Sequence, residues 1–421
     1  MSGGAPWKRE EGERFSPNGS PALMRAINAE QVIRKLRARG PLSRADLARA
    51  TGLSKPTITK VVEHLEELGY VAAVNEPDRE GMAFVARYEY RASRGQVLGV
   101  DVGADKSLLL LADLDGNILG SSRFATRSAA PGGPPQVFEQ LKAAADDLLA
   151  TAGASRGSLL SVVLGTPGVV SPAGVVTMAP QLEGWEGLDL RSALQDLFDC
   201  PVSVEGELSL SLQAEGWRGV AKGLDDALFV HLGVGVGAAL LVGGKIHRGA
   251  DGGAGEIGQM PYPIRRPDGR TDFVPLESLA GGGALQRRGR ELAVRAGASR
   301  LLDLVGGDVN RIDASTVFRA SREGDAASRS LLDEATEVLA WGISTVICAL
   351  NPPAVIVGGG LSRGADLFLP QLQRHTSSLV PFPPAWFVSQ LGDEAVALGA
   401  VKQATAMTEQ DLFESLGRRA S

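Results

Sequence analysis

The chain has 421 residues, of which 44% are hydrophobic and 22% charged, with 53 glycines. This length exceeds what one hydrophobic core usually covers and predicts two or three globular domains, and the composition excludes a fibrous or disordered chain. The formal net charge is -6, but residues 1–95 hold 16 Lys and Arg against 12 Asp and Glu, whereas residues 96–421 hold 27 against 37. The basic N-terminal part is therefore the candidate for contact with nucleic acid.

The cysteine content and the apolar segments indicate a cytoplasmic protein without membrane contact. Cys200 and Cys348 are far apart and have no Cys-x-x-Cys spacing, which predicts neither a disulfide framework nor a metal site. No apolar stretch of a signal peptide follows Lys8 and Arg9. Residues 227–242 are apolar, but they include His231 and fall short of the roughly 20 residues that a spanning helix needs.

The N-terminal part predicts a tail and three helices. Residues 1–21 lack hydrophobic periodicity, and we expect a flexible tail there. Apolar residues at helical spacing predict a helix over residues 22–38. Ser43 and Ser54 are expected to cap two further helices, the first through Thr51 with Asp46 as a short capping-box partner, the second through Leu68.

Two strands complete this domain. They are predicted over residues 70–74 and 82–90 around a turn at residues 77–81, which is the wing of a winged helix. The predicted DNA-binding domain, a winged helix-turn-helix, therefore covers residues 22–90.

The helix after Ser54 is expected to lie in the major groove of double-stranded DNA. If its apolar residues face the core, the side chains on its other face can reach bases, while the helix N-termini at Ser43 and Ser54 can hold phosphates. Arg44 is expected at a phosphate and Arg79, at the wing tip, in the minor groove. The candidate DNA-binding residues are Ser43, Arg44, Ser54, Lys55, Thr57, Thr59, Lys60 and Arg79. The alternatives are an ordinary helical hairpin with a solvated basic face, and a wing arginine that contacts only water.

After a linker at residues 91–96, strands and helices alternate in a pattern typical of an α/β fold. Strands are predicted at 97–102, 107–114, 118–124, 159–165, 202–205, 227–232, 237–242 and 354–357, and helices at 137–152, 190–198, 326–350 and 395–406. The last helix is rich in small residues, so we expect it to pack closely on another helix.

From about Asn28 to the C-terminus the sequence resembles the ROK family (repressors, open reading frames, kinases), in particular its transcriptional-regulator branch. The order and spacing of the matching segments carry the resemblance. These segments are Gly40-Pro41-Leu42-Ser43-Arg44-Ala45-Asp46-Leu47-Ala48, Gly99-Val100-Asp101-Val102-Gly103, Gly165-Thr166-Pro167-Gly168, Gly184-Trp185-Glu186-Gly187, Gly233-Val234-Gly235-Val236-Gly237, Gly253-Ala254-Gly255-Glu256-Ile257-Gly258, Asn351-Pro352 and Gly358-Gly359-Gly360.

The resemblance implies a two-lobed, actin-like ATPase fold with a cleft between the lobes. We expect lobe 1 to comprise residues 97–205 plus 395–421, and lobe 2 residues 206–394. In this family a sugar lies at the bottom of the cleft and, in the kinases, ATP lies above it.

Departures from the family pattern predict that the kinase site is degenerate, with no catalytic residue and no cofactor. Family kinases carry Glu-Asn-Asp-Ala-Asn, in which the Asp is the catalytic base, where this chain has Glu205-Gly206-Glu207-Leu208-Ser209. The extra methylene of Glu207 displaces the carboxylate by about 1 Å, a shift that can cost about a hundredfold in rate. The usual Gly-Thr-Gly phosphate turn is Gly233-Val234-Gly235, and Asp105 adds negative charge nearby.

The resemblance also bears on metal and sugar binding. Gln259 replaces a family zinc ligand and residues 261–276 contain no Cys, so no zinc site is expected. The candidate effector-binding residues are Gly165, Glu207, Glu256 and Glu277; the family counterpart of Glu256 binds sugar hydroxyls. For the glutamates, helix capping or simple surface exposure is the alternative interpretation. Trp185 is expected in the core rather than in the cleft wall.

These features favour a DNA-binding transcriptional regulator, a repressor, that binds a pseudo-palindromic operator as a homodimer or dimer of dimers and responds to a sugar or sugar-phosphate effector. One alternative is an active ATP-dependent sugar kinase with an appended DNA-binding domain. Another is a regulator whose cleft is vestigial and binds no ligand.

Overall fold

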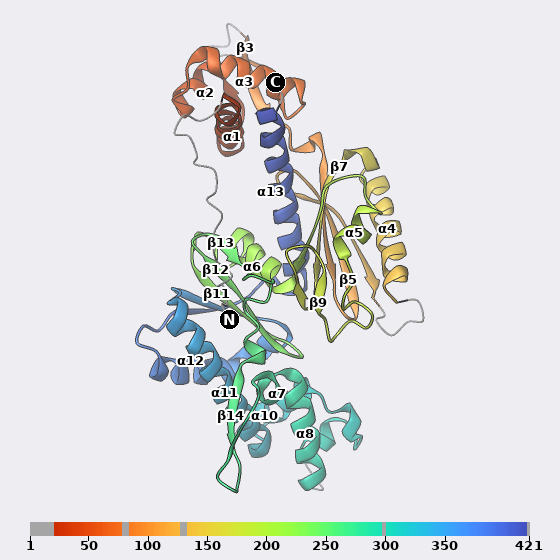
Figure 1. Cartoon of the computed structure of the whole chain (residues 1–421), viewed down its shortest axis with the longest axis vertical. Coiled ribbons are helices and arrows are strands. Elements are labelled where there is room, and N and C mark those ends of the chain that lie inside the picture. Colours follow the sequence, from red (N-terminus) through yellow and green to blue (C-terminus); the bar gives the residue numbers. More distant parts are fainter. Residues whose placement is uncertain (1–20, 78–83, 127–132, 297–299, 419–421) are drawn as a thin grey trace, which may run out of the picture. The chain divides into compact units, whose positions relative to one another are not determined.

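The computed structural model describes residues 21–77, 84–126, 133–296 and 300–418, and its contacts divide the chain into two compact units. Unit 1 comprises Met1–Gly95 together with Ala406–Ser421, and unit 2 comprises Gln96–Thr405. Figure 1 shows the elements of both units. Residues 1–20 of the predicted tail, Arg79 and most of the predicted wing turn lie outside the described residues.

Unit 1 contains the three helices and the paired strands that the sequence predicts. They are α1 (Pro21–Arg39), β1 (Leu42–Ser43), α2 (Arg44–Thr51), α3 (Lys55–Glu67), β2 (Val71–Pro77) and β3 (Phe84–Tyr90). The strands form an antiparallel sheet in the order β1-β3-β2, in which the short β1 was not predicted. The 3-10 turn η1 (Ala92–Arg94) lies in the segment expected to be a linker.

Both predicted helix caps are present. The Ser43 hydroxyl accepts a hydrogen bond from the Asp46 N–H (3.1 Å) and the Asp46 carboxylate accepts one from the Ser43 N–H (3.3 Å), which completes a capping box. Hydrogen bonding from Ser43 lowers the pKa of Asp46 below its usual value. The Ser54 hydroxyl accepts from the Thr57 N–H (3.3 Å) at the start of α3. Such caps each stabilise a helix by about 1 kcal/mol.

The C-terminal helix α13 (Ala395–Arg418) runs 12 residues beyond the predicted helix and corrects one expected boundary. We assigned residues 395–421 to lobe 1, but residues from Ala406 onward belong to unit 1. Leu412 and Leu416, spaced by one helical turn, are buried in the same hydrophobic cluster as α1 and α3. Arg37 forms an ion pair with Glu409, and Arg25 Nε donates to the Leu416 carbonyl (3.3 Å).

The first half of unit 2 is built on a five-stranded sheet in the order β10-β7-β4-β5-β6. β4 and β5 pair antiparallel, as do β5 and β6, whereas β7 runs parallel to both β4 and β10. Its elements are β4 (Gln96–Val102), β5 (Lys106–Asp113), β6 (Ile118–Ala125), α4 (Gly133–Thr151), η2 (Arg156–Ser158), β7 (Leu159–Thr166), β8 (Val169–Val170), β9 (Val176–Met178), α5 (Leu190–Gln195) and β10 (Val202–Gly206).

The two faces of β4 have different packing partners, as the alternation of a strand requires. Leu98, Val100 and Val102 lie in a cluster with α4 and α5, which lie beside the sheet in Figure 1. On the other face a Cβ at Gly99 would lie 2.5 Å from the Ala397 carbonyl of α13, so only glycine permits this approach. Trp185 is 1% exposed and packs against Phe138, which confirms the predicted core position.

The second half of unit 2 is built on a sheet in the order β13-β12-β11-β16-β17. Its strands and helices are α6 (Glu207–Arg218), β11 (Ala227–Leu232), β12 (Val236–Val242), β13 (Lys245–His247), η3 (Ile257–Gln259), β14 (Pro261–Arg265), β15 (Thr271–Pro275), α7 (Glu277–Ala280), α8 (Gly282–Ala296), α9 (Arg300–Leu304), η4 (Val309–Arg311), α10 (Ala314–Arg322), α11 (Ala326–Leu350), β16 (Ala354–Gly358), η5 (Gly360–Gly364), α12 (Ala365–Leu379), β17 (Ala385–Val388) and η6 (Gly392–Glu394).

Helix α6 contacts strands of both sheets and therefore links the two halves of unit 2. It contacts β7 and β10 of the first sheet and β11, β12 and β13 of the second. The small-residue helix α13 packs closely on it, as predicted: a Cβ at Gly399 would lie 1.9 Å from the Leu210 carbonyl of α6. The N-terminus of α6 consequently lies where the two halves meet.

Several elements of unit 2 were not predicted from the sequence. Residues 261–275, expected only to lack a zinc site, form the antiparallel hairpin of β14 and β15, and helices α8, α10 and α12 were not assigned. Among the described residues, no helix combines the length and the apolar character needed to cross a membrane.

The burial of α13 in unit 1 predicts that Leu416→Ala destabilises this unit. Removing a buried leucine side chain costs about 2–5 kcal/mol. Amide hydrogen exchange in α1 and α3 should accelerate, whereas Lys402→Ala, at an exposed position of the same helix, should leave it unchanged. Unaltered exchange in the Leu416 variant would show that the C-terminal turns of α13 do not stabilise unit 1.

Candidate functional site

The outer face of α3 carries the predicted basic edge. Ile58, Val61, Val62 and Leu65 are buried in unit 1, as expected. Lys55 and Lys60 are exposed, while Thr57 and Thr59 are partly exposed. Within the described part of the chain neither lysine forms an ion pair, so both ammonium groups remain available for phosphate oxygens.

The two N-cap serines have a structural role that limits their expected part in DNA binding. The Ser43 hydroxyl also donates to the Asp46 carboxylate (2.7 Å), and the Ser54 hydroxyl lies 2.8 Å from that of Thr57. Because Pro56 lacks an N–H and the Thr57 N–H is capped, the Lys55 N–H is the donor that the first turn of α3 still offers to an anion.

Arg44 is directed toward its own domain rather than held out for a phosphate. Its guanidinium lies 5.2 Å from the centre of the Tyr88 ring and 3.6 Å from the Glu63 carboxylate. Its Nε is buried and has no hydrogen-bond partner. A phosphate contact would therefore require Arg44 to leave Tyr88 and Glu63, which corrects the simple expectation from its position after the cap.

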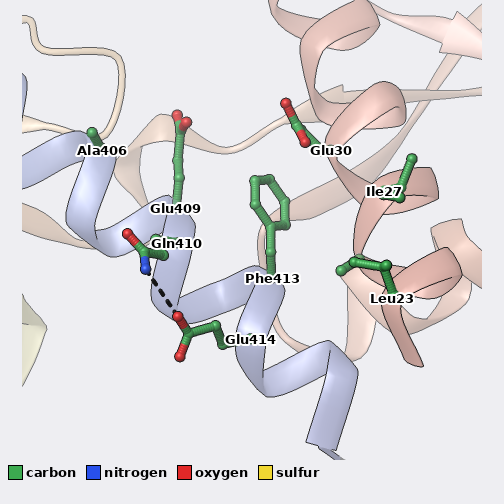
Figure 2. Close-up of a pocket in the computed structure, with 9 residues that line it drawn as sticks. Leu23, Ile27, Glu30, Ala406, Glu409, Gln410, Phe413 and Glu414 are labelled. Carbon is green, nitrogen blue, oxygen red and sulfur yellow. Dashed lines mark hydrogen bonds between the residues drawn. The ribbon is translucent and has the colours of Figure 1, made fainter. Parts of the chain in front are cut away.

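A groove that the sequence did not predict lies in unit 1 between α1 and α13, with a volume of about 470 Å³ (Figure 2). Leu23 and Ile27 of α1 lie across from Phe413 of α13. Glu30 and Glu409 also line the groove. The apolar lining residues recur at helical spacing, and this spacing is the same for a groove as for a packed helix interface, so the sequence does not predict the groove.

Unit 2 contains a cleft of about 470 Å³ that brings distant polar residues together. Its walls come from the ends of β4, β7 and β11, the N-terminus of α6 and the turns around β12 and η3. The polar side chains that line it are Asp101, Asp105, Lys106, Gln181, Glu207, Ser209, His231, Glu256, Gln259 and Glu277. Of the four predicted effector residues, Glu207, Glu256 and Glu277 therefore meet in one cavity.

Two carboxyl groups in the cleft have strongly raised pKa values. Burial, reinforced by the charge of Glu207, raises the pKa of Asp101 to about 8. Burial and the neighbouring Glu256 raise the pKa of Glu207 to about 7. The Asp101 Oδ1 atom is buried without a hydrogen-bond partner. A ligand hydroxyl could satisfy this oxygen.

Glu256 and Glu277 differ in their hydrogen-bond partners. Glu277 Oε2 accepts a hydrogen bond from the Val236 N–H (3.2 Å), and its Oε1 accepts one from Gln259 Nε2 (2.7 Å). Among the described residues Glu256 has no such side-chain partner, and burial followed by repulsion from Glu277 raises its pKa. Glu277 is therefore fixed in place, whereas Glu256 is available to a ligand.

The carbonyl groups of the Gly233-Val234-Gly235 turn accept hydrogen bonds within the protein. The Gly233 carbonyl accepts from the Gly282 N–H (2.9 Å) and the Val234 carbonyl from the Gly283 N–H (2.9 Å), so the first turn of α8 is already hydrogen-bonded. A Cβ at Gly235 would lie 2.5 Å from Glu277 Oε2, which places that carboxylate directly against the turn.

The basic side chains near the cleft are paired or uncharged. Lys106 forms an ion pair with Asp393. Burial lowers the pKa of His231 to about 4, so its imidazole is neutral at physiological pH. Arg248, outside the cleft lining, makes a two-pronged ion pair with Glu205 (2.8 and 3.0 Å), and Gln403 donates to the same carboxylate (2.7 Å).

Gly165 does not lie where the sequence places it. It is in the buried strand β7, where a Cβ would lie 2.5 Å from Val396 and 2.7 Å from Leu210. Its family motif reaches the cleft two residues later, through Pro167 and Gly168. The physical reason for glycine at position 165 is close packing against α6 and α13.

Sequence reasoning did not include Asp101 or His231 among the effector-binding residues. Both follow apolar strand residues at the carboxyl end of a strand, and this position is a signal that could have identified them. Within the described ranges, no three His, Cys, Asp or Glu side chains are grouped closely enough to hold a metal ion.

The raised pKa of Asp101 predicts that stability falls with increasing pH. The folded protein keeps a proton on Asp101 up to about pH 8, whereas an unfolded carboxyl loses it near 3.8. The stabilising contribution is therefore complete below pH 4 and is lost as pH rises through 8. Asp101→Asn should raise the free energy of unfolding at pH 9 by several kcal/mol, because each unit of the pKa difference corresponds to about 1.4 kcal/mol.

Urea unfolding between pH 5 and pH 9 measures this effect. Asp105→Asn, at an exposed position of the same turn, is the matched control and should retain the pH dependence of the unsubstituted chain. If the free energy of unfolding changes with pH equally in the Asp101 variant and in the unsubstituted chain, the raised pKa is not that of Asp101.

Two family comparisons cover most of the chain. Residues 97–406 match the ROK family and residues 31–80 match the MarR family. A xylose repressor of Caldicellulosiruptor bescii is 25% identical over 390 residues, which cover 91% of this chain and 96% of the repressor. The DNA-binding transcriptional dual regulator NagC of Escherichia coli is 23% identical over 86% of this chain and 88% of its own length.

Solved structures and a curated enzyme extend the similarity to both branches of the family. A ROK family transcriptional regulator, a homologue of the E. coli MLC protein, superposes with a TM-score of 0.74 over 94% of this chain and 98% of its own, at 21% identity, which shows a shared fold. A ROK family glucokinase from Streptomyces griseus, in complex with glucose and AMPPNP, is 28% identical with a TM-score of 0.60 and covers 74% of this chain and 100% of its own. A glucokinase of Halalkalibacterium halodurans is 27% identical over 72% of this chain and 92% of its own length.

The family match spans well over half of the chain, includes the cleft residues and follows a winged helix of MarR type. The chain therefore belongs to the ROK family and carries an N-terminal winged-helix DNA-binding domain.

Proposed function

We propose that the chain is a DNA-binding transcriptional regulator, a repressor, whose affinity for its operator responds to a sugar in the cleft of unit 2. The observation that carries this proposal is the presence of two features in one chain. Lys55 and Lys60 form a basic edge on a recognition helix and have no ion-pair partner among the described residues, and Glu207 and Glu256 meet in a polar cleft of unit 2. Relatives named as sugar repressors that match along nearly the whole chain support it.

DNA binding follows from the helix-turn-helix geometry. Helix α3 offers Lys55, Thr57, Thr59 and Lys60 to the major groove, and Ser43 and Ser54 lie where phosphates would pass. Arg44 would join them by leaving Tyr88 and Glu63. Arg79 belongs to the same proposal, although it lies outside the described residues. A homodimer, or a dimer of dimers, would place two such helices on a pseudo-palindromic operator one DNA turn apart.

The regulatory response follows from linkage. A sugar that binds one conformation of the chain better than another shifts the population toward it, and DNA affinity changes if the two conformations bind the operator differently. Glu256 and Glu207 are the side chains that we assign to sugar hydroxyls, with Asp101 beside them. Glu277 shapes this site mainly through the contacts that hold it against Gln259 and Val236.

We further propose that the chain does not transfer phosphoryl groups. The Gly233-Val234-Gly235 turn carries no hydroxyl where the family's Gly-Thr-Gly phosphate turn has one, and the Asp105 carboxylate lines the same cleft. The alternative, an ATP-dependent sugar kinase, is favoured by one observation: Glu207 lies in the cleft with a pKa of about 7, a value suited to a general base.

The DNA-binding part predicts that Lys55→Ala and Lys60→Ala each weaken binding across sequences. Each loss of a phosphate contact should reduce the slope of log affinity against log salt by about 0.9. Fluorescence anisotropy with duplexes from the chain's own locus measures this slope. Lys142→Ala, an exposed lysine of α4 in unit 2, is the control and should not change it. Equal slopes for all three variants would contradict the assignment of α3.

The regulatory part predicts no turnover in an ADP-release assay across common hexoses. If phosphoryl transfer is absent, ADP release stays at background in the presence of ATP, Mg²⁺ and each sugar. Measurable turnover that disappears in Glu207→Gln would establish the kinase alternative instead.

A further inference from the structure

We propose that the cleft of unit 2 selects an unphosphorylated sugar and rejects phosphorylated or otherwise anionic sugars. This inference deepens the proposed function, on which it rests, by defining the charge class of the effector. Three observations support it. Carboxylates surround the cavity, the nearby basic side chains are paired or uncharged, and the helix N-termini at the cleft already interact with groups of the protein.

Negative charge dominates the lining of the cleft. Asp101, Asp105, Glu207, Glu256 and Glu277 all line it. Three pairs of these carboxyl groups repel each other: Glu207 acts on Asp101, Glu256 on Glu207, and Glu277 on Glu256. Because the pKa values of Asp101, Glu207 and Glu256 are raised, the site has little capacity for the further charge of a phosphate ester.

No available cation offsets this charge among the described lining residues. Lys106 and His231 are the basic side chains there. Lys106 is paired with Asp393, and His231 is neutral because burial lowers its pKa to about 4. Arg123, whose charge lowers the pKa of Asp101, is paired with Glu394 (3.0 Å). Phosphate recognition normally uses Arg or Lys side chains that can approach the oxygens, and the cleft offers none unpaired.

Helix N-termini could in principle supply backbone donors to an anion, but two of them already serve groups of the protein. Helix α6 starts at the cleft with Glu207 in its first turn, so a carboxylate occupies the region of its positive end. The Gly282 and Gly283 N–H groups at the start of α8 donate to the Gly233 and Val234 carbonyls.

The same carboxyl groups suit an uncharged polyol. Glu256 has acceptor oxygens without a side-chain partner, and Asp101 Oδ1 is buried without one. Sugar hydroxyls can donate to carboxylates and can also accept from protonated carboxyls. A neutral sugar therefore satisfies these groups without adding to the repulsion between them.

The test uses isothermal titration calorimetry of the full chain at pH 8 with matched pairs: glucose and glucose 6-phosphate, N-acetylglucosamine and its 6-phosphate, and xylose and xylose 5-phosphate. At least one unphosphorylated sugar should bind, and its phosphate ester should bind at least about tenfold more weakly, the factor that one pKa unit of repulsion represents. Equal or tighter binding of the phosphate ester overturns the inference and leaves the proposed sugar response intact.

If no sugar or sugar phosphate of the panel binds, the inference and the proposed sugar response are both overturned. The salt-slope measurement on α3 then decides separately whether the DNA-binding part of the proposed function stands. A failure of the charge selectivity can thus be distinguished from a failure of the proposed sugar response, because only the first involves a bound phosphate ester.

Two neutral, isosteric variants test the cause of the selectivity. Glu207→Gln and Glu256→Gln should each narrow the ratio between sugar and sugar-phosphate affinities, even if both affinities fall. Glu291→Gln removes an equal charge from an exposed position of α8 outside the cleft and should leave the ratio unchanged. A ratio that stays constant in both cleft variants would show that their charge does not exclude the phosphate.

The ratio between sugar and sugar-phosphate affinities should also depend on pH. Asp101 and Glu207, with pKa values of about 8 and 7, gain protons as pH falls from 8 to 5.5, and the phosphate ester loses its second charge near pH 6. Repulsion therefore weakens on both sides, and the ratio should narrow toward pH 5.5. A ratio that widens over this range would contradict an electrostatic origin.

Discussion

The low capacity of the cleft for negative charge is the physical constraint on which the chemistry of this protein depends. Asp101, Glu207 and Glu256 are partly removed from water and repel one another, and among the described residues that line the cleft no cation is free to offset their charge. Such an arrangement opposes the polyanionic nucleotide that a kinase must bind, but it leaves acceptors for the hydroxyls of a neutral sugar. The same constraint thus connects the proposed loss of phosphoryl transfer with the proposed choice of effector.

Close backbone packing keeps these groups in place. Glycine at position 99 and position 399 allows α13 to contact β4 and α6 at distances that a Cβ would prevent. Helix α6 contacts both sheets of unit 2 and presents Glu207 to the cleft. Helix α13 continues from these contacts into residues that are buried in the core of unit 1. One continuous helix therefore contributes to the packing around the cleft and to the stability of the DNA-binding domain.

The local features of the chain could largely be predicted from the sequence. Ser43 and Ser54 cap their helices, and Ile58 and Val62 are buried, because capping and helical periodicity depend on neighbouring residues. The structure adds contacts that the sequence does not predict where side chains pack against residues distant in the chain. Gly165 serves packing rather than the cleft, and Arg44 contacts Tyr88, 44 residues away. The placement of residues 406–421 in unit 1 likewise depends on an apolar helix face. No local sequence pattern predicts the residues against which this face packs.

The sequence by itself determined the winged helix and the alternating strands and helices, since these follow from short-range periodicity, while the ROK fold and the altered kinase motifs followed from the resemblance of its segments to the family. Only the tertiary structure decided that Asp101 and His231 join the glutamates, that Glu277 is held by Gln259, and that Lys106 forms an ion pair with Asp393. The reason is that charge and solvation at a site depend on which groups folding brings together, and a linear sequence does not specify those distances.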